Sequence, residues 1–340
     1  MQKPGRLLLL DSASLYFRAF HGVPESVTAP DGTPVNAVRG FLDTIARLVT
    51  ERRPARMVAC WDEDWRPAFR VAAIPSYKAH RVAADGGEEV PAGLVPQVPV
   101  IVDVLAALGI ARRGAPGFEA DDVIGTLVER EVAGRPGAGG TGSAGAGGRA
   151  DGAAAAGQDA DGGAGAPVEV VTGDRDLFQL VDDAAGVSAL YTAGRGRTLL
   201  ERVDQAWLRA RYGIPSGAAY ADLAILRGDP SDGLPGVPGI GEKTAAALLA
   251  RHGDLDALLA AADGVGTSLT PAQRTRIRAA RDYLAVAPAV VRVARDAPVA
   301  DGDDTLPTAP ADPAALEALA QRWNLTGPVG RVLQALTAGR

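Results

Sequence analysis

Short apolar runs alternate with helical patterns along residues 1–202 of the chain. The runs Leu7–Leu10, Met57–Trp61 and Val168–Thr172 are typical of buried β-strands, and Val187–Tyr191 predicts a further strand. Apolar residues at helical spacing predict helices from about Ser14 onward and over Asn36–Thr50, Val98–Leu108, Asp121–Val132 and, as a short helix, Asp176–Val181. Strands separated by helices indicate a parallel sheet with helices on both faces, so we expect an α/β fold class.

The pattern becomes mostly helical from Val203 onward. Helical spacing recurs over Val203–Tyr212, Ala218–Arg227, Lys243–His252, Leu255–Ala261, Pro271–Ala285 and Pro313–Trp323. We therefore expect an α/β domain over residues 1–202, a mostly helical domain over 203–300 and a helical extension over 301–340. Residues 133–166 consist largely of glycine and alanine, which predicts a flexible insertion within the first domain.

Composition narrows the class of protein. The 340 residues are 47% hydrophobic, which is ample for a buried core, and they include a single cysteine, Cys60, so no disulfide framework is possible. The net charge of −6 argues weakly against a nucleic-acid partner, although local clusters of charge decide binding. The leucine run near the N-terminus is too short for a signal peptide or a membrane span. We expect a cytoplasmic protein with no membrane partner.

Acidic side chains follow the predicted strands. Asp11, Asp62 and Asp174 come directly after three of them, and the carboxyl ends of parallel strands are where α/β sheets bind ligands. Further acids lie at a helix start in GFEADDVIG, beside Asp174, and in RGDPSDGLPG: Glu119, Asp121, Asp122, Asp176, Asp229 and Asp232. Each also has a structural interpretation, because aspartates commonly cap helices and occupy turns.

The coincidence of these acids favours a metal site. Carboxylates that converge repel one another unless cations lie between them. Oxygen ligands without histidine favour Mg²⁺ or Mn²⁺. Several such groups suit two ions about 4 Å apart, the arrangement that stabilises both oxygens of a phosphoryl displacement.

A basic segment accompanies the acids. Residues Trp65–Arg81 carry four cations and no acid, with Trp65, Phe69 and Tyr77 interleaved. Cations can neutralise phosphates while aromatic rings stack on bases, so Lys78 or Arg70 is expected to offset charge on a scissile phosphate. The alternative is a solvated helix whose aromatic side chains lie in the core.

A glycine-rich turn follows in Leu234–Thr244, which we interpret as helix, turn, helix. Gly239 and Gly241 permit a tight turn, and the N–H groups at the start of the next helix can hold a DNA phosphate. Such a hairpin contacts the duplex backbone without reading its sequence. A plain helix-capping turn has a similar pattern.

These motifs, taken in order, resemble one known family. It is the 5′-nuclease domain of bacterial DNA polymerase I, in the flap endonuclease superfamily with its PIN-like fold. The resemblance runs from Leu7 to about residue 300 and rests on LLLLDSASLYFRAFHG, ACWDED, FR…SYKAHR, GFEADDVIGTL, TGDRDLFQLV and GDPSDGLPGVPGIGEKTA.

The resemblance implies roles for individual residues. It implies a PIN-like parallel-sheet nuclease core and a helix-three-turn-helix domain that holds DNA and often binds K⁺. A first metal group is implied for Asp11, Asp62, Glu119 and Asp121, and a second for Asp122, Asp174, Asp176, Asp229 and Asp232. Roles around the scissile phosphate and in a helical arch or clamp are implied for Arg18, Arg70, Tyr77, Lys78 and Arg81. DNA contacts at the hairpin are implied for Gly236, Val237, Gly239, Gly241, Lys243 and Thr244.

The expected activity is that of a 5′-3′ exonuclease and structure-specific 5′ flap endonuclease. Its substrates would be 5′-flapped, nicked or gapped DNA and RNA–DNA primer ends, in primer removal and repair, with replication or repair proteins as further partners. Gly233 departs from the asparagine usual in the family, and the chain reaches Arg340 without a polymerase module, which favours a stand-alone nuclease. A PIN-type ribonuclease and a non-catalytic DNA junction binder are the alternatives.

Overall fold

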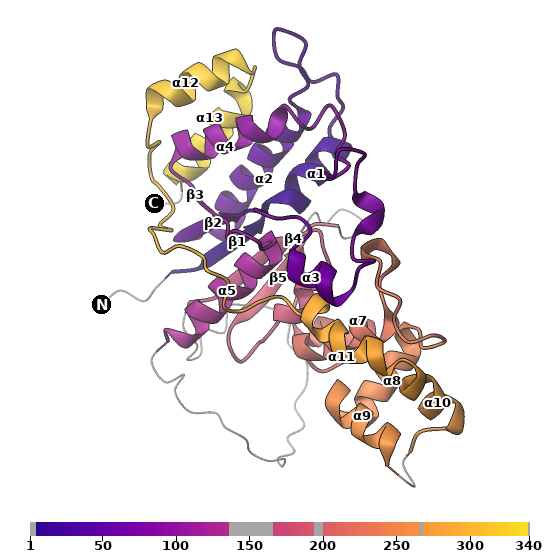
Figure 1. Cartoon of the computed structure of the whole chain (residues 1–340). Coiled ribbons are helices and arrows are strands. Elements are labelled where there is room, and N and C mark those ends of the chain that lie inside the picture. The colour runs from indigo at the N-terminus through magenta and orange to yellow at the C-terminus, as the bar shows by residue number, and fades with distance from the viewer. Residues whose placement is uncertain (1–4, 136–165, 194–199, 265–267, 339–340) are drawn as a thin grey trace.

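A single β-sheet forms the centre of the larger part of the molecule (Figure 1). The computed structural model describes residues 5–135, 166–193, 200–264 and 268–338, and within them six strands pair in the order β3-β2-β1-β4-β5-β6. Neighbouring strands from β3 to β5 in this order are all parallel, and β6 is antiparallel to β5. The strands are β1 (Leu7–Asp11), β2 (Arg56–Cys60), β3 (Ala111–Arg113), β4 (Val168–Thr172), β5 (Val187–Tyr191) and β6 (Glu201–Val203).

The apolar runs are continuous because both faces of the sheet are covered. Leu8 and Leu10 of β1 pack against helices on one face, and Leu7 and Leu9 pack against α5 (Ala120–Ala133) on the other. The helices on the first face are α1 (Ser12–Gly22), α2 (Asn36–Arg52), α4 (Gln97–Leu108), α12 (Pro313–Arg322) and α13 (Thr326–Ala338). The last two come from the end of the chain, so residues 301–338 pack largely on the sheet part.

The helical part lies beside the carboxyl ends of the central strands (Figure 1). It consists of α6 (Gln205–Tyr212), α7 (Gly217–Arg227), α8 (Glu242–His252), α9 (Leu255–Asp263), α10 (Pro271–Ala279) and α11 (Arg281–Val291). Capping residues Asp204, Ser216, Asp254 and Thr270 each accept a hydrogen bond from the first turn of the helix that follows. A cluster of buried apolar residues joins these helices to α3 (Ala68–Ala73).

The predicted α/β architecture is confirmed, with differences in single elements. The predicted helix Val203–Tyr212 is wrong at its start, because Glu201–Val203 pairs with β5 and Asp204 caps the helix. The predicted helix Pro271–Ala285 is two helices that meet at Ala280. Residues 234–241 contain no helix, so the α-helix that precedes the glycine turn is α7, which is followed by the short 3₁₀ helix η3 (Pro230–Asp232). Strands β3 and β6 and helices α3 and α13 were not predicted.

Two segment predictions are not decided by this structure. Most of the glycine- and alanine-rich insertion, residues 136–165, lies outside the described residues. The domain boundaries at residues 202 and 300 stay predictions.

Candidate active site

Three strand ends bring acidic residues to one edge of the sheet. Asp11 is the last residue of β1 and lies opposite Cys60, the last residue of β2. Asp62 follows β2 and accepts a hydrogen bond from the N–H of Ala120 (2.9 Å), which fixes the start of α5 at this edge. Asp174 follows β4, the other neighbour of β1. The predicted meeting of acids at the carboxyl ends of the strands is therefore what the structure contains.

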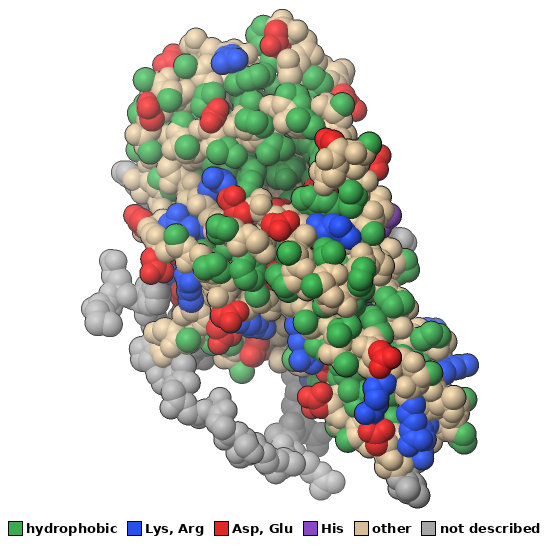
Figure 2. Space-filling model, in the orientation of Figure 1, with side chains coloured by type: hydrophobic (Ala, Val, Ile, Leu, Met, Phe, Trp, Pro, Cys, Tyr) green, Lys and Arg blue, Asp and Glu red, His purple; other side chains and the backbone are tan. Residues whose placement is uncertain are grey.

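A narrow pocket opens where this edge meets the helical part. Apolar residues at the end of α11 and just beyond it, among them Val290 and Val293, form part of its wall. The charged and phenolic residues that line it are Arg70, Tyr77, Lys78, Arg81, Glu119, Asp121, Asp174, Asp176 and Asp232. On the face seen in Figure 2, acidic and basic side chains lie side by side across the middle of the molecule.

The carboxylates raise one another's pKa. Burial, and then the charges of Asp62 and Asp174, raises the pKa of Asp11 to about 7. Burial, followed by Asp11 and Asp174, raises the pKa of Asp121 well above its ordinary value. Burial and the charge of Asp174 do the same for Asp176. Burial and mutual repulsion disfavour the ionised form of each of these acids. A bound cation would offset that repulsion.

Arg70 lies beneath the pocket and is committed to an internal ion pair. It is 2% exposed, and its Nη1 donates to Glu119 Oε2 (2.5 Å) and Asp122 Oδ2 (2.8 Å). Its Nη2 donates to Asp122 Oδ1 (2.6 Å) and its Nε to the carbonyl of Val290 (3.0 Å). With four of its N–H···O contacts made inside the protein, Arg70 holds α3, α5 and α11 together.

Asp122 is also directed away from the open pocket. Besides Arg70, its carboxylate accepts the N–H groups of Ala294 (2.8 Å) and Glu119 (3.2 Å). It is fully buried and forms a capping box with Glu119 at the start of α5. The structure brings the other acids of the predicted set to the pocket or its surroundings, but it gives Asp122 a structural set of partners.

Lys78 is the cation nearest the acids. Its Nζ is hydrogen-bonded to Glu119 Oε1. Burial lowers the pKa of Lys78, but its acidic neighbours, Glu119 first and then Asp232, together raise that pKa above its ordinary value. The ammonium group is therefore charged at physiological pH. Arg81, in the short helix η1 (Ala79–Arg81), donates to Asp232 Oδ1 (2.8 Å).

The aromatic residues of the basic segment divide between core and surface. Tyr77 is buried, and its hydroxyl donates to Glu119 Oε2 (2.7 Å), so its ring is not available for stacking on a base. Phe69 is 40% exposed and packs against Phe118, with the two rings tilted and their centroids 5.6 Å apart. Of the remaining predicted residues, Arg18 is exposed on α1, and Asp229 begins η3 (Pro230–Asp232) near Asp176.

The glycine-rich turn connects η3 to α8. Gly236 and Gly239 have φ values of +65° and +77°, which favour glycine, whereas Gly241 is extended and precedes the helix. The N–H of Val237 donates to the carbonyl of Leu226 at the end of α7 (2.9 Å). Lys243 is exposed in the first turn of α8 and Thr244 is half-buried beside it.

Two residues near the acids were not predicted. Thr172, the last residue of β4, donates from its hydroxyl to Asp11 Oδ2 (2.6 Å), and its place directly before the Gly-Asp of TGDRD is a signal that could have identified it. Glu88 lies close enough to Lys78 and Asp62 for their charges to affect it, and burial raises its pKa. It sits in a loop whose sequence shows no pattern.

The donor set suits a hydrated divalent cation. Among the described residues, no three Asp, Glu, His or Cys side chains are grouped so that they could hold a metal ion by themselves. Mg²⁺ commonly keeps several waters and takes only one or two carboxylates from the protein. Oxygen donors whose ionisation is opposed by their neighbours fit such an ion.

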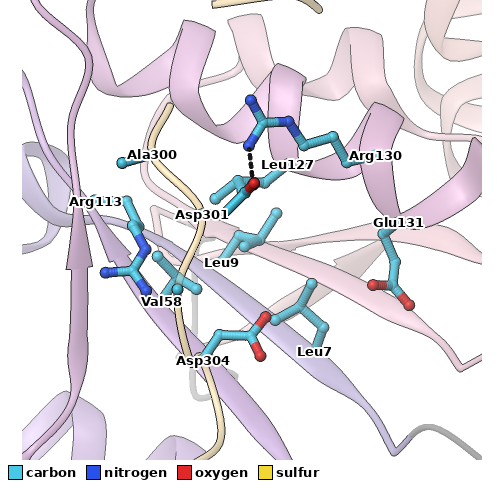
Figure 3. Close-up of a pocket in the computed structure, with 11 residues that line it drawn as sticks. Leu7, Leu9, Val58, Arg113, Leu127, Arg130, Glu131, Ala300, Asp301 and Asp304 are labelled. Carbon is cyan, nitrogen blue, oxygen red and sulfur yellow. Dashed lines mark hydrogen bonds and ion pairs between the residues drawn. The ribbon is translucent and has the colours of Figure 1, made fainter. Parts of the chain in front are cut away.

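A second hollow lies on the α5 face of the sheet and contains none of the predicted site residues (Figure 3). Leu7, Leu9 and Val58 form its apolar floor, and the ion pair between Arg130 and Asp301 (3.3 Å) spans its rim.

Within the described ranges, no helix has the length and apolar character needed to cross a membrane.

Sequence comparisons match both parts of the chain. The family described as 5′-3′ exonuclease, N-terminal resolvase-like domain, matches residues 6–137, and that described as 5′-3′ exonuclease, C-terminal SAM fold, matches residues 216–314. A 5′-3′ exonuclease of Streptomyces coelicolor is 57% identical over 336 residues, 97% of this chain and 100% of that protein. A 5′-3′ exonuclease of Mycobacterium tuberculosis is 50% identical and covers 97% of each chain.

Solved structures share the fold at low sequence identity. Bacteriophage T5 5′-exonuclease with bound zinc ions has a TM-score of 0.60 at 16% identity, over 98% of both chains. The catalytic core of Rad2 in complex with a DNA substrate has a TM-score of 0.55 at 16% identity, over 99% of this chain and 93% of that one.

Proposed function

This chain therefore belongs to the 5′-3′ exonuclease family and is a nuclease, and from that premise we propose that it cuts DNA at 5′ flaps, nicks and gaps. The observation that carries the proposal is the single pocket that Asp121, Asp174 and Asp232 line together with Lys78. Acids from separate strands and loops meet there beside a cation. Hydrolysis of a phosphodiester bond needs this combination, because negative charge builds on the phosphate as the bond breaks.

We propose that Mg²⁺ or Mn²⁺ is held at this pocket, as two ions. Each ion would take one or two carboxylates directly and contact the others through its waters. The carboxylates assigned to the two ions are Asp121, Asp174, Asp176 and Asp232 in the pocket and Asp11, Asp62 and Asp229 around it, with Glu119 adjoining and Asp122 left to its structural role. Bound ions would supply an activated water and stabilise the charge of the phosphate and leaving oxygen. Thr172, through its hydrogen bond, orients the carboxylate of Asp11.

The cations of the basic segment have different roles in this proposal. Lys78, whose ammonium group is charged in the pocket, is placed to stabilise charge on the scissile phosphate. Arg70 acts indirectly by fixing Glu119 and the start of α5, since four of its five N–H donors are already used. Arg81 holds Asp232, and Arg18 on α1 is exposed and free to meet a strand entering the site.

We propose that the helical part holds duplex DNA. The T5 and Rad2 structures are described with DNA or metal ions bound, which supports the same class of partner here. Lys243 is exposed beside the N–H groups that open α8, a favourable place for a backbone phosphate. Basic side chains also gather over the α8–α10 part in Figure 2. Contacts of this kind bind DNA without regard to sequence, as a nuclease that recognises structure requires.

A K⁺ ion at the glycine turn stays a prediction that follows from the family resemblance. The carbonyl of Gly239 already accepts a hydrogen bond from Nη1 of Arg276 (3.0 Å). The guanidinium lies so close that a Cβ at Gly239 would be 2.8 Å from Cζ of Arg276. A monovalent cation at this turn would therefore compete with Arg276 for this carbonyl.

A cleavage assay tests the proposed function. A 5′-flap DNA substrate is expected to be cut in Mg²⁺, and chelation or Asp174→Ala is expected to abolish cutting. Asp103→Ala, at an exposed aspartate of α4 outside the pocket, is the matched control and should cut normally. Cleavage that persists with chelator would refute the metal site, preferential cutting of single-stranded RNA would favour the ribonuclease, and tight binding without cutting would favour the junction binder.

A further inference from the structure

A set of hydrogen bonds joins the basic segment to the loop around η3. We call it the clasp, and it consists of Ser76, Lys78, Arg81, Ser231, Asp232 and Gly233. The hydroxyl of Ser76 donates to the carbonyl of Gly233 (2.7 Å), and the N–H of Lys78 donates to the carbonyl of Asp232 (3.0 Å). Nη2 of Arg81 donates to the carbonyl of Ser231 (3.0 Å) as well as to Asp232. The clasp thus ties a segment following α3 to the connection between α7 and α8.

The loop on one side of the clasp is internally fixed. Asp229 and Leu234 exchange two backbone hydrogen bonds of 3.0 and 2.8 Å, which close the loop at its base. The carboxylate of Asp229 accepts the N–H of Ser231 (2.8 Å) and caps η3. The basic segment is therefore held against a rigid support.

Lys78 has an unusual backbone conformation on the other side. Its φ is +48°, and among the described non-glycine residues only Arg53 and Asn324 share a positive φ. Arg53 has an ordinary reason, because it ends α2, but Lys78 precedes a short 3₁₀ helix. The left-handed region is unfavourable for a residue with a Cβ, and such conformations persist when surrounding contacts enforce them.

Gly233 permits the close approach that the clasp requires. Its φ is +72°, and a Cβ built there would overlap the carbonyl oxygen of Ser76. A side chain at this position would push the segment carrying Lys78 away from Asp232.

We propose that the clasp positions Lys78. In this inference, Gly233 and Ser76 are positioning residues that hold Lys78 in its left-handed conformation, so that its ammonium group stays among the carboxylates of the pocket. The inference rests on the proposed function, because a correctly placed Lys78 matters only where a phosphate is cut. It extends that function by assigning roles to residues that touch neither metal nor DNA.

Two glycine substitutions distinguish displacement of Lys78 from backbone strain alone. Gly213 has φ +75°, and a Cβ there would meet nothing within 4 Å among the described residues, so Gly213→Ala introduces similar strain without displacing the basic segment. Gly233→Ala is expected to lower kcat for flap cleavage by on the order of a hundredfold with little change in KM, as misplacement of a catalytic group does. Gly213→Ala should leave kcat unchanged, and equal losses in the two variants would overturn the inference.

A double-mutant cycle tests whether Gly233 acts through Lys78. In a Lys78→Ala background, Gly233→Ala is expected to lower kcat by no more than about twofold, because the group it displaces is gone. Additive effects would overturn the inference. Ser76→Ala, which adds no atoms and removes one hydrogen bond, should lower kcat by about fivefold and guards against a Gly233→Ala protein that does not fold.

Amide hydrogen exchange provides a readout that does not depend on activity. The N–H of Lys78 should be protected in the wild-type protein and in Gly213→Ala, and exposed to exchange in Gly233→Ala. An unprotected Lys78 amide in an active wild-type enzyme would overturn the clasp alone. If the Lys78 amide is protected but the wild-type protein fails to cut flap DNA, the proposed function is overturned, and the catalytic role of Lys78 with it. The hydrogen bonds of the clasp would still be supported by that result.

Discussion

Ionisation of Asp11 should destabilise the protein when no divalent cation is bound. Burial, reinforced by Asp62 and Asp174, raises the pKa of Asp11 from 3.8 to about 7. Between these pH values the folded protein keeps a proton that the unfolded chain has released. The folded state therefore binds more protons, and the free energy of unfolding falls as the pH rises from about 4 to about 7.

The size of this effect is measurable. A pKa difference of this kind corresponds to roughly 4 kcal/mol, a large share of the stability of an ordinary domain. Asp11→Asn removes the charge and keeps an oxygen that can accept the N–H of Ser14. The substitution is expected to raise the free energy of unfolding at pH 8 by up to about 4 kcal/mol, to change it little at pH 4, and to abolish cleavage.

Urea unfolding at pH 4 and pH 8, with chelator and with Mg²⁺, tests the reasoning. Mg²⁺ should stabilise the wild-type protein at pH 8 by about 2.7 kcal/mol when present at a hundred times its Kd, and should stabilise Asp11→Asn less. Asp103→Asn is the control for loss of one exposed charge and should follow the wild type at both pH values. If Asp11→Asn is no more stable than the wild type in chelator at pH 8, the electrostatic account of the pocket is wrong.

Three further predictions separate structural from functional residues. Arg70→Met should destabilise the fold by about 3–5 kcal/mol in urea unfolding, because it leaves Glu119 and Asp122 without their buried partner; a loss below 1 kcal/mol would contradict the ion-pair role. Asp174→Asn should abolish cleavage without lowering stability, since this side chain is exposed and its charge repels that of Asp11. Lys243→Ala should weaken DNA binding equally for all sequences and reduce the salt dependence by about one phosphate contact in a titration; an unchanged slope would place the phosphate elsewhere.

The strands were predictable because both sides of the sheet are buried. A run such as Leu7–Leu10 has no polar alternation, and this pattern is typical of a parallel strand covered on two faces. The edge strands β3 and β6 are three residues long and contain Arg and Glu side chains, so no apolar run marks them. Their pairing depends on neighbouring strands, which a local pattern does not contain.

The acids of the site were predictable in kind but not in detail. Their sequence positions after strands show that they meet, because the topology of a parallel sheet fixes which ends coincide. Sequence does not show that Asp122 turns inward to Arg70, since adjacent aspartates at a helix start look equivalent until the partner across the fold is known. The same holds for Tyr77, whose hydroxyl finds Glu119, 42 positions later in the chain.

The contacts of the buried Arg70 also determine when the pocket can form during synthesis of the chain. Its partners include the carbonyl of Val290, and Asp122 accepts the N–H of Ala294, so the wall of the pocket is contributed late in the sequence. A ribosome-bound chain that has emerged only as far as Asp176 has the strand-end aspartates but lacks this wall and the support for Lys78. Because synthesis proceeds from the N-terminus, cutting activity should arise only after Val290 and Ala294 have left the ribosome, when the wall can close around the acids.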